Sequence, residues 1–106
     1  MLIDLYGGRN LNDPTRIEAA LRDAAEEAGA TVLTVSLHHF SPEGVTGVAI
    51  LAESHMSIHT WPDAGYAAID VFMCGECDPN ATLPALKRHF EPRDVKTAEH
   101  LRGAVA

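Results

Sequence analysis

The sequence predicts an α+β fold, a two-layer sandwich in which a mostly antiparallel sheet carries helices on one face. Apolar, β-branched segments outnumber helical ones, and their order is strand, helix, two strands, then two strands, helix, strand. Because so few helices cannot cover both faces of a sheet, we expect one face to stay open. The length of 106 residues is that of one domain, so residues 1–106 are expected to form a single unit.

The first strand and the first helix carry clear signals. Residues 2–6 (LIDLY) are short and apolar, as in an opening strand. In residues 12–30, Asp13 suits the N-cap of a helix, Pro14 its first turn and Gly29 its C-terminal end. Apolar side chains recur there near helical spacing and predict one buried face: Ile17, Leu21, Ala24, Ala25 and Ala28.

A run of strands is predicted next. Residues 31–40 are β-branched and mostly alternate, and SPEG at 41–44 is typical of a turn. Residues 45–54 (VTGVAILAES) predict a more buried strand, and residues 55–61 (HMSIHTW) predict a short one that stops at Pro62.

The last part of the chain repeats this alternation of elements. After a PDAG turn, residues 66–74 (YAAIDVFMC) predict another apolar strand. Asp78 and Pro79 then begin a second helix, and residues 94–101 (DVKTAEHL) close the chain as an edge strand. The helix is expected to turn three side chains inward: Leu83, Leu86 and Phe90.

Charge and composition restrict the partners. Eight Lys and Arg against 15 Asp and Glu give a net charge of −7, which argues against nucleic acid and anionic membranes. No apolar run is long enough to span a bilayer and the start lacks a signal peptide, so we expect a cytoplasmic protein with reduced thiols. The open sheet face predicts a homodimer, and a polar, solvated face is the alternative.

Residues 51–75 (LAESHMSIHTWPDAGYAAIDVFMCG) gather the polar groups that could do chemistry. A zinc site is one interpretation, because His55 and His59 are four residues apart and Cys74 and Cys77 form a CxxC pair. On an extended strand, however, the two His lie about 13 Å apart and cannot share an ion. The CxxC pair has no second pair at zinc-ribbon spacing, so we expect no metal.

A catalytic cluster is the other interpretation. Ser54 follows Glu53 where an apolar strand ends, His59 comes five residues later across a possible tight corner, and Cys74 ends the next strand. A hydroxyl, an imidazole and a thiol that converge at strand ends make a plausible nucleophilic site. The alternative is structural, because such groups often satisfy backbone atoms or fill the core.

The same stretch resembles a known family. ESHMSIHTWPDAGYAAIDVFMCG is similar to the signature of the short prokaryotic S-adenosylmethionine decarboxylase proenzymes. The resemblance extends upstream through GATVLTVSLHHFSPEGVTGVAILAESH, the opening LIDLYG and the helix that begins with DP, and so covers nearly the whole chain.

The resemblance implies that the chain cuts itself between Glu53 and Ser54, into a β chain of residues 1–53 and an α chain of residues 54–106. Ser54 would attack the Glu53 carbonyl, and the resulting ester would open to leave a pyruvoyl group as the cofactor. His59 matches the family's processing histidine, and Thr46 stands where the family usually has a processing serine. Thr keeps the hydroxyl but has restricted rotamers, so we expect slower processing.

The resemblance also implies a substrate site. The pyruvoyl group would form a Schiff base with S-adenosylmethionine, and Cys74 matches the cysteine that returns a proton to the α-carbon. Phe40 matches an aromatic residue that stacks on adenine, with an ordinary core Phe as the alternative. Asp63 stands where the family usually has a ribose-binding Glu, and is one methylene shorter.

The implied function is decarboxylation of S-adenosylmethionine for spermidine synthesis, by a homodimer of αβ protomers whose sheets face each other. Thr46 and Asp63 leave open a related decarboxylase of ornithine or arginine. A further alternative is an unprocessed nucleoside-binding module that keeps the fold without the chemistry.

Overall fold

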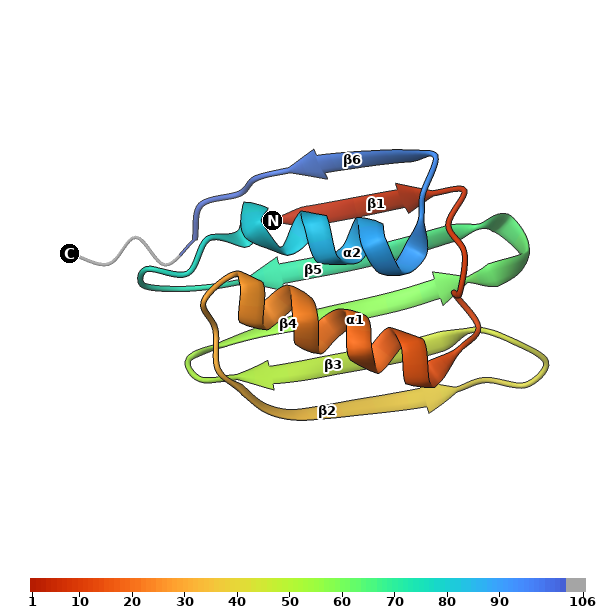
Figure 1. Ribbon diagram of the computed structural model, residues 1–106, viewed down its shortest axis with the longest axis horizontal. Helices are drawn as coiled ribbons and strands as arrows, with labels where there is room; N and C mark the ends of the chain where they lie inside the picture. Colours follow the sequence, from red (N-terminus) through yellow and green to blue (C-terminus); the bar gives the residue numbers. More distant parts are fainter. Residues whose placement is uncertain (103–106) are drawn as a thin grey trace.

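A computed structural model of the protein describes residues 1–102. Six strands form one antiparallel sheet in the order β2-β3-β4-β5-β1-β6, and both helices lie on one of its faces (Figure 1). The predicted two-layer α+β sandwich and the predicted order of elements are confirmed. The elements are β1 (Leu2–Tyr6), α1 (Pro14–Glu27), β2 (Val32–His39), β3 (Val45–Leu51), β4 (Ser54–Trp61), η1 (Pro62–Ala64), β5 (Tyr66–Phe72), η2 (Pro79–Thr82), α2 (Leu83–Phe90) and β6 (Asp94–Ala98).

The hydrophobic core fills the layer between the sheet and the helices. Asp13 caps α1 as predicted, because its Oδ1 accepts a hydrogen bond from the Arg16 N–H at 3.2 Å. Alternate residues of the central strands point toward the helices, and burial of each large side chain contributes roughly 1.5–3 kcal/mol. The largest buried side chains include Ile3, Leu5, Ile17, Leu21, Met56, Ile58, Ile69, Leu86 and Phe90. Of the three side chains expected inward on α2, only Leu83, at its first residue, is partly exposed.

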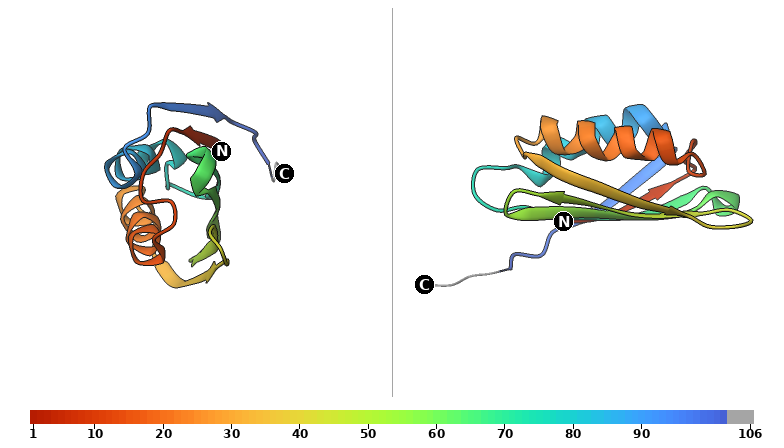
Figure 2. Two further views of the ribbon diagram at one scale, coloured as in Figure 1. Left: turned by 90° about the vertical axis from the view of Figure 1, so that its right-hand side faces the viewer. Right: turned by 90° about the horizontal axis from the view of Figure 1, so that it is seen from below.

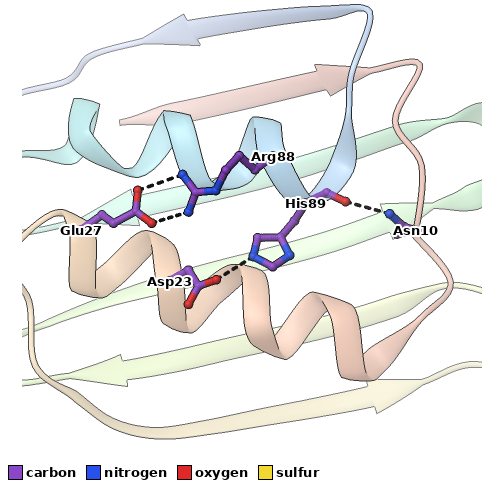
Figure 3. Close-up of polar contacts among 5 residues, drawn as sticks. All are labelled: Asn10, Asp23, Glu27, Arg88 and His89. Atoms are coloured by element: carbon purple, nitrogen blue, oxygen red, sulfur yellow. Dashed lines mark hydrogen bonds and ion pairs between the residues drawn. The ribbon is translucent and has the colours of Figure 1, made fainter.

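Polar contacts join α1 to α2 (Figure 3). The Arg88 guanidinium donates hydrogen bonds to the Glu27 carboxylate, and the His89 ring bonds Asp23 Oδ2 at 2.7 Å. The Asn10 amide donates to the carbonyl oxygen of His89 at 2.8 Å. The hydrogen bond from Arg88 lowers the pKa of Glu27. Because the Arg88–Glu27 pair is exposed to solvent, it contributes little to the stability of the fold.

Within residues 1–102, no helix lies on the second face of the sheet, as expected (Figure 2). Its composition is mixed, so neither a uniformly apolar nor a uniformly polar face describes it. Ile50 and Trp61 are large apolar residues that are 46% and 43% exposed. The strand alternation places polar and charged side chains beside them, among them Asp4, Thr46, Ser57, Asp70 and Lys96.

Several predicted boundaries are wrong: β5 ends at Phe72 rather than at residue 74, β6 ends at Ala98 rather than at residue 101, and α2 begins at Leu83 after the short helix η2. A further one, between β3 and β4, matters for the site. Residues 45–54 do not form one strand, because β3 ends at Leu51 and a two-residue turn of Ala52 and Glu53 leads into β4. β4 then runs without a break from Ser54 to Trp61. No local pattern predicts this turn, since two-residue hairpin turns favour Gly, Asn or Asp and this one contains none of them.

The sheet therefore has two ends that differ in chemistry. The Ser54 end contains the ends of β3, β5 and β6 and the starts of β4 and β1; the His59 end contains the opposite ends of the same strands (Figure 1). The strand β1 lies between β5 and β6. Among residues 1–102, no helix is long and apolar enough to cross a membrane.

Candidate active site

The Glu53–Ser54 peptide bond lies in a strained turn at the Ser54 end. Leu51 pairs with Ser54 across the hairpin, and Glu53 has a φ of +63°. This left-handed conformation costs a residue with a Cβ roughly 1–2 kcal/mol. The Ser54 Oγ is 3.4 Å from the Ala52 carbonyl oxygen, so only a weak hydrogen bond holds its hydroxyl. The hydroxyl is therefore easily turned toward the neighbouring carbonyl carbon.

The Cys74 thiol contacts the carbonyl group of that same bond. Its Sγ lies 2.6 Å from the Glu53 carbonyl oxygen, to which the S–H donates. Cys74 follows the end of β5, and Gly75 at a φ of +68° turns the chain away immediately afterwards. A donor at this position stabilises negative charge on the oxygen when a nucleophile attacks the carbon. The structure thus brings together Glu53, Ser54 and Cys74.

Thr46 and His59 form a second polar group at the His59 end. They are cross-strand partners on β3 and β4, and the Thr46 Oγ1 lies 2.6 Å from the His59 Nδ1. The Trp61 ring lies 4.3 Å from the His59 ring, between ring centroids. The hydroxyl and the indole together fix the plane of the imidazole and direct its other nitrogen, Nε2, away from Thr46.

The two groups are too far apart to act together within one chain. Five residues of extended strand separate Ser54 from His59, which corresponds to about 16 Å. A general base must approach its proton to within about 3 Å. The expectation that hydroxyl, imidazole and thiol converge is therefore wrong for His59. The tight corner that the sequence suggested between Ser54 and His59 lies instead before Ser54.

Phe40 and Asp63 lie at the His59 end. Together with His59 they line a hollow of about 200 Å³. Phe40 is 42% exposed, so the alternative of an ordinary core Phe is wrong. Glu43, which no sequence motif indicates, lines the same hollow, and its Oε1 accepts a hydrogen bond from the Asp63 N–H at 3.0 Å. Only the pairing of β3 with β4 brings the two turns together, so no local pattern could have identified Glu43.

An aromatic row continues from this hollow across the open face. Trp61 stacks on Tyr66 with ring centroids 5.1 Å apart, and Tyr66 stacks on Tyr6 at 5.4 Å. The Tyr66 hydroxyl donates a hydrogen bond to Asp4 Oδ1 at 2.6 Å, which raises the pKa of Tyr66 to about 12. The row packs the sheet around the His59 end.

A larger cavity opens beside Cys74 at the Ser54 end. Its volume is about 480 Å³, and Phe72, Cys74, Gly75 and the chain after β6 are among its walls. A narrower hollow of about 260 Å³ adjoins Phe72 and His55, whose rings stack with centroids 5.5 Å apart. The protein thus offers space for a small molecule at each end of the sheet.

The fold and the site together define a class: α+β sandwich proteins with a serine at a strained peptide bond whose carbonyl is held by a thiol. Residues 1–103 match the family model described as S-adenosylmethionine decarboxylase, and the chain belongs to this family. The family suggested by the ESH and IHTWP motifs is therefore confirmed.

Relatives and a solved structure agree with this assignment. The chain is 46% identical over 108 residues to the S-adenosylmethionine decarboxylase proenzyme of Methanococcus maripaludis strain C7, with 99% of this chain and 88% of the relative covered. It is 48% identical over 108 residues to the proenzyme of Acidithiobacillus ferrooxidans, with 99% and 81% covered. The crystal structure of the adenosylmethionine decarboxylase from Aquifex aeolicus VF5 is similar with a TM-score of 0.86 and 34% identity, with 99% of this chain and 89% of that chain covered.

Proposed function

We propose that the protein is a self-processing, pyruvoyl-dependent decarboxylase of S-adenosylmethionine. The observation that carries the proposal is the Glu53–Ser54 bond, which is strained, preceded by a tight turn and polarised by the Cys74 thiol at 2.6 Å. The family and the printed names of the relatives support S-adenosylmethionine as the substrate over ornithine or arginine.

Processing begins at the strained bond. The Ser54 Oγ attacks the Glu53 carbonyl carbon, its proton passes to a base, and the peptide nitrogen leaves with a proton to give an ester. The left-handed Glu53 raises the energy of the starting amide, and the Cys74 S–H stabilises the oxyanion of the attack. Loss of the α-proton of Ser54 then expels the Glu53 carboxylate. Addition of water and loss of ammonia convert the remaining three carbons into the pyruvoyl group.

The residues around Ser54 fit such a group. His55, which would carry it, stacks on Phe72, so the new chain end stays in register with β5. The pyruvoyl group supplies a carbonyl sink for the electron pair released as CO2 leaves. Cys74 lines the cavity of about 480 Å³ and contacts the carbonyl oxygen of Glu53, and in this proposal it returns a proton to the substrate α-carbon.

A homodimer would complete the site. Thr46 and His59 lie about 16 Å from Ser54 in their own chain. Within one chain, neither can therefore take a proton from Ser54 or from the groups next to it. If two open faces meet around a two-fold axis that lies in the plane of the interface and runs across the strands, the His59 end of one protomer faces the Ser54 end of the other. The exposed apolar residues of the open face, such as Ile50 and Trp61, would be buried by this pairing.

The same arrangement would divide the substrate between the protomers. At the His59 end, Phe40 offers a face for adenine, and Asp63 offers a carboxylate for the two ribose hydroxyls. At the Ser54 end, the cavity beside Cys74 would receive the amino acid portion. A cationic sulfonium between them suits a chain with a net charge of −7.

Mass spectrometry of the denatured protein tests the proposal. We expect two fragments, residues 1–53 and a fragment from residue 54 onward whose serine start is lighter by the mass of one ammonia. The Ser54→Ala variant should give only the intact chain, and purified cut protein should release CO2 from S-adenosylmethionine. An intact wild-type chain that binds a nucleoside would instead support the binding-module alternative.

A further inference from the structure

The chain after β6 forms a short strap, residues 99–102, at the Ser54 end of the sheet. β6 ends beside the start of β1, and the chain then continues on the side of the sheet that the helices leave open (Figure 2). The strap is attached at its start, where the Asn80 amide donates to Glu99 Oε1 at 3.0 Å. At its other end, the Arg102 guanidinium carbon lies over the Phe72 ring, 4.9 Å from its centroid. Two contacts of different kinds therefore hold the strap.

Arg102 shares a cavity with the candidate proton donor. The cavity of about 480 Å³ is lined by Cys74 on one side and by the strap on the other. Arg102 is the only Lys or Arg among the described residues that line it. Phe72, on which the guanidinium stacks, precedes Cys74 by two residues, a separation of about 7 Å in extended chain. Among residues 1–102, no carboxylate forms an ion pair with Arg102.

We infer that Arg102 binds the α-carboxylate of the substrate. This inference rests on the proposed function, in which Cys74 protonates the α-carbon. The carboxylate is bonded to that same carbon, so it enters the cavity beside the Cys74 thiol. A planar guanidinium whose face rests on an aromatic ring keeps its N–H edge free for a carboxylate, which it can hold with two parallel hydrogen bonds. Arg102 is thus a substrate-binding residue that favours the substrate, which still carries its α-carboxylate, over the decarboxylated product.

The inference predicts a particular kinetic pattern. In the bound substrate, Arg102 contacts a carboxylate that carries a full negative charge. In the transition state this charge moves away from the departing CO2, so the contact with Arg102 weakens. Loss of Arg102 should therefore weaken binding of the substrate without slowing the chemical step. The decarboxylated product keeps the nucleoside and the amine but has no carboxylate, so its affinity should not depend on Arg102.

The experiment uses the full-length, processed protein as wild type, Arg102→Gln and Arg102→Lys. Arg16→Gln serves as the matched control, since it removes an exposed arginine near the start of α1, on the opposite layer. Intact mass first establishes that each variant is cut, and steady-state decarboxylation then gives kcat and KM. We expect Arg102→Gln to raise KM by about 10- to 100-fold with kcat unchanged or slightly higher, as for loss of a charge-assisted hydrogen bond pair. The inhibition constant of the decarboxylated product should stay the same, and Arg102→Lys should recover part of the loss.

The possible results separate this inference from the function on which it rests. If wild type is cut and active but Arg102→Gln has an unchanged KM, the inference is wrong and the proposed function stands. The same holds if the affinity for the product falls as far as the affinity for the substrate, because Arg102 would then only support the cavity wall. If wild type is neither cut nor active, the proposed function is wrong and the inference fails with it.

Discussion

The distance between Ser54 and His59 can be tested by mixing two inactive chains. Ser54→Ala keeps the histidine but has no nucleophile, and His59→Ala keeps the nucleophile but has no base. Each alone should fail to cut itself at the normal rate, with loss of a general base costing roughly 10²–10⁴-fold in His59→Ala. Within one chain the imidazole would need to move about 16 Å to reach Ser54, which a continuous β4 does not permit.

In a mixed dimer, His59 of the Ser54→Ala chain would serve the intact Ser54 of the other chain. With equal amounts and random pairing, about half of the His59→Ala chains acquire such a partner and should be cut. The assay unfolds and refolds the two variants together and follows fragments by intact mass, with each variant refolded alone as the control. If the mixture is cut no faster than His59→Ala alone, the two ends do not meet across a dimer and the composite site is wrong.

Further predictions concern single groups. Cys74→Ala should still cut itself, but more slowly than wild type, because it lacks the hydrogen bond to the Glu53 carbonyl. Its decarboxylation should be at least about 10²-fold slower, by the scale of general acid catalysis. Full turnover would remove the thiol from the mechanism. Asp63→Ala should raise KM about tenfold, by loss of a charge-assisted hydrogen bond, and leave cutting unchanged in mass spectra; an unchanged KM would contradict ribose binding. Because the pKa of Tyr66 is raised to about 12 from 10.0, its link to Asp4 should stabilise the fold fully below pH 10 and lose its effect between pH 10 and 12. Absorbance titration of phenolate should show one late tyrosine that is missing in Tyr66→Phe, and its titration at the ordinary pH would refute the assignment.

Local signals in the sequence were sufficient to predict the elements of the fold. Asp13, Pro14 and Gly29 mark the ends of α1, and alternation marks β2 and β4, because caps and periodicity act over a few residues. The members of the cluster around the Glu53–Ser54 bond could also be named in advance, since Glu53 and Ser54 belong to the contiguous ESH motif and Cys74 ends the apolar run of the next strand.

The spatial arrangement of the site could not be predicted in the same way. The hairpin at Ala52 and Glu53 has no turn-forming residue, and its strain is visible only once β3 and β4 are paired. The position of His59 follows from that hairpin, so an error of a few residues in one strand boundary changed which groups meet. The strap that brings Arg102 onto Phe72 depends on contacts between distant parts of the chain, which no periodicity records.

The place of β1 in the sheet decides what happens to the two fragments once the chain is cut. Residues 1–53 would supply β1, α1, β2 and β3, whereas residues 54 onward would supply β4, β5, α2 and β6. β1 is hydrogen-bonded on both edges by strands of the other fragment, and β3 is paired along its length with β4. The strands of the two fragments therefore alternate within a single hydrogen-bonded sheet. They should co-migrate through every native purification step, and they separate only when the whole sheet melts.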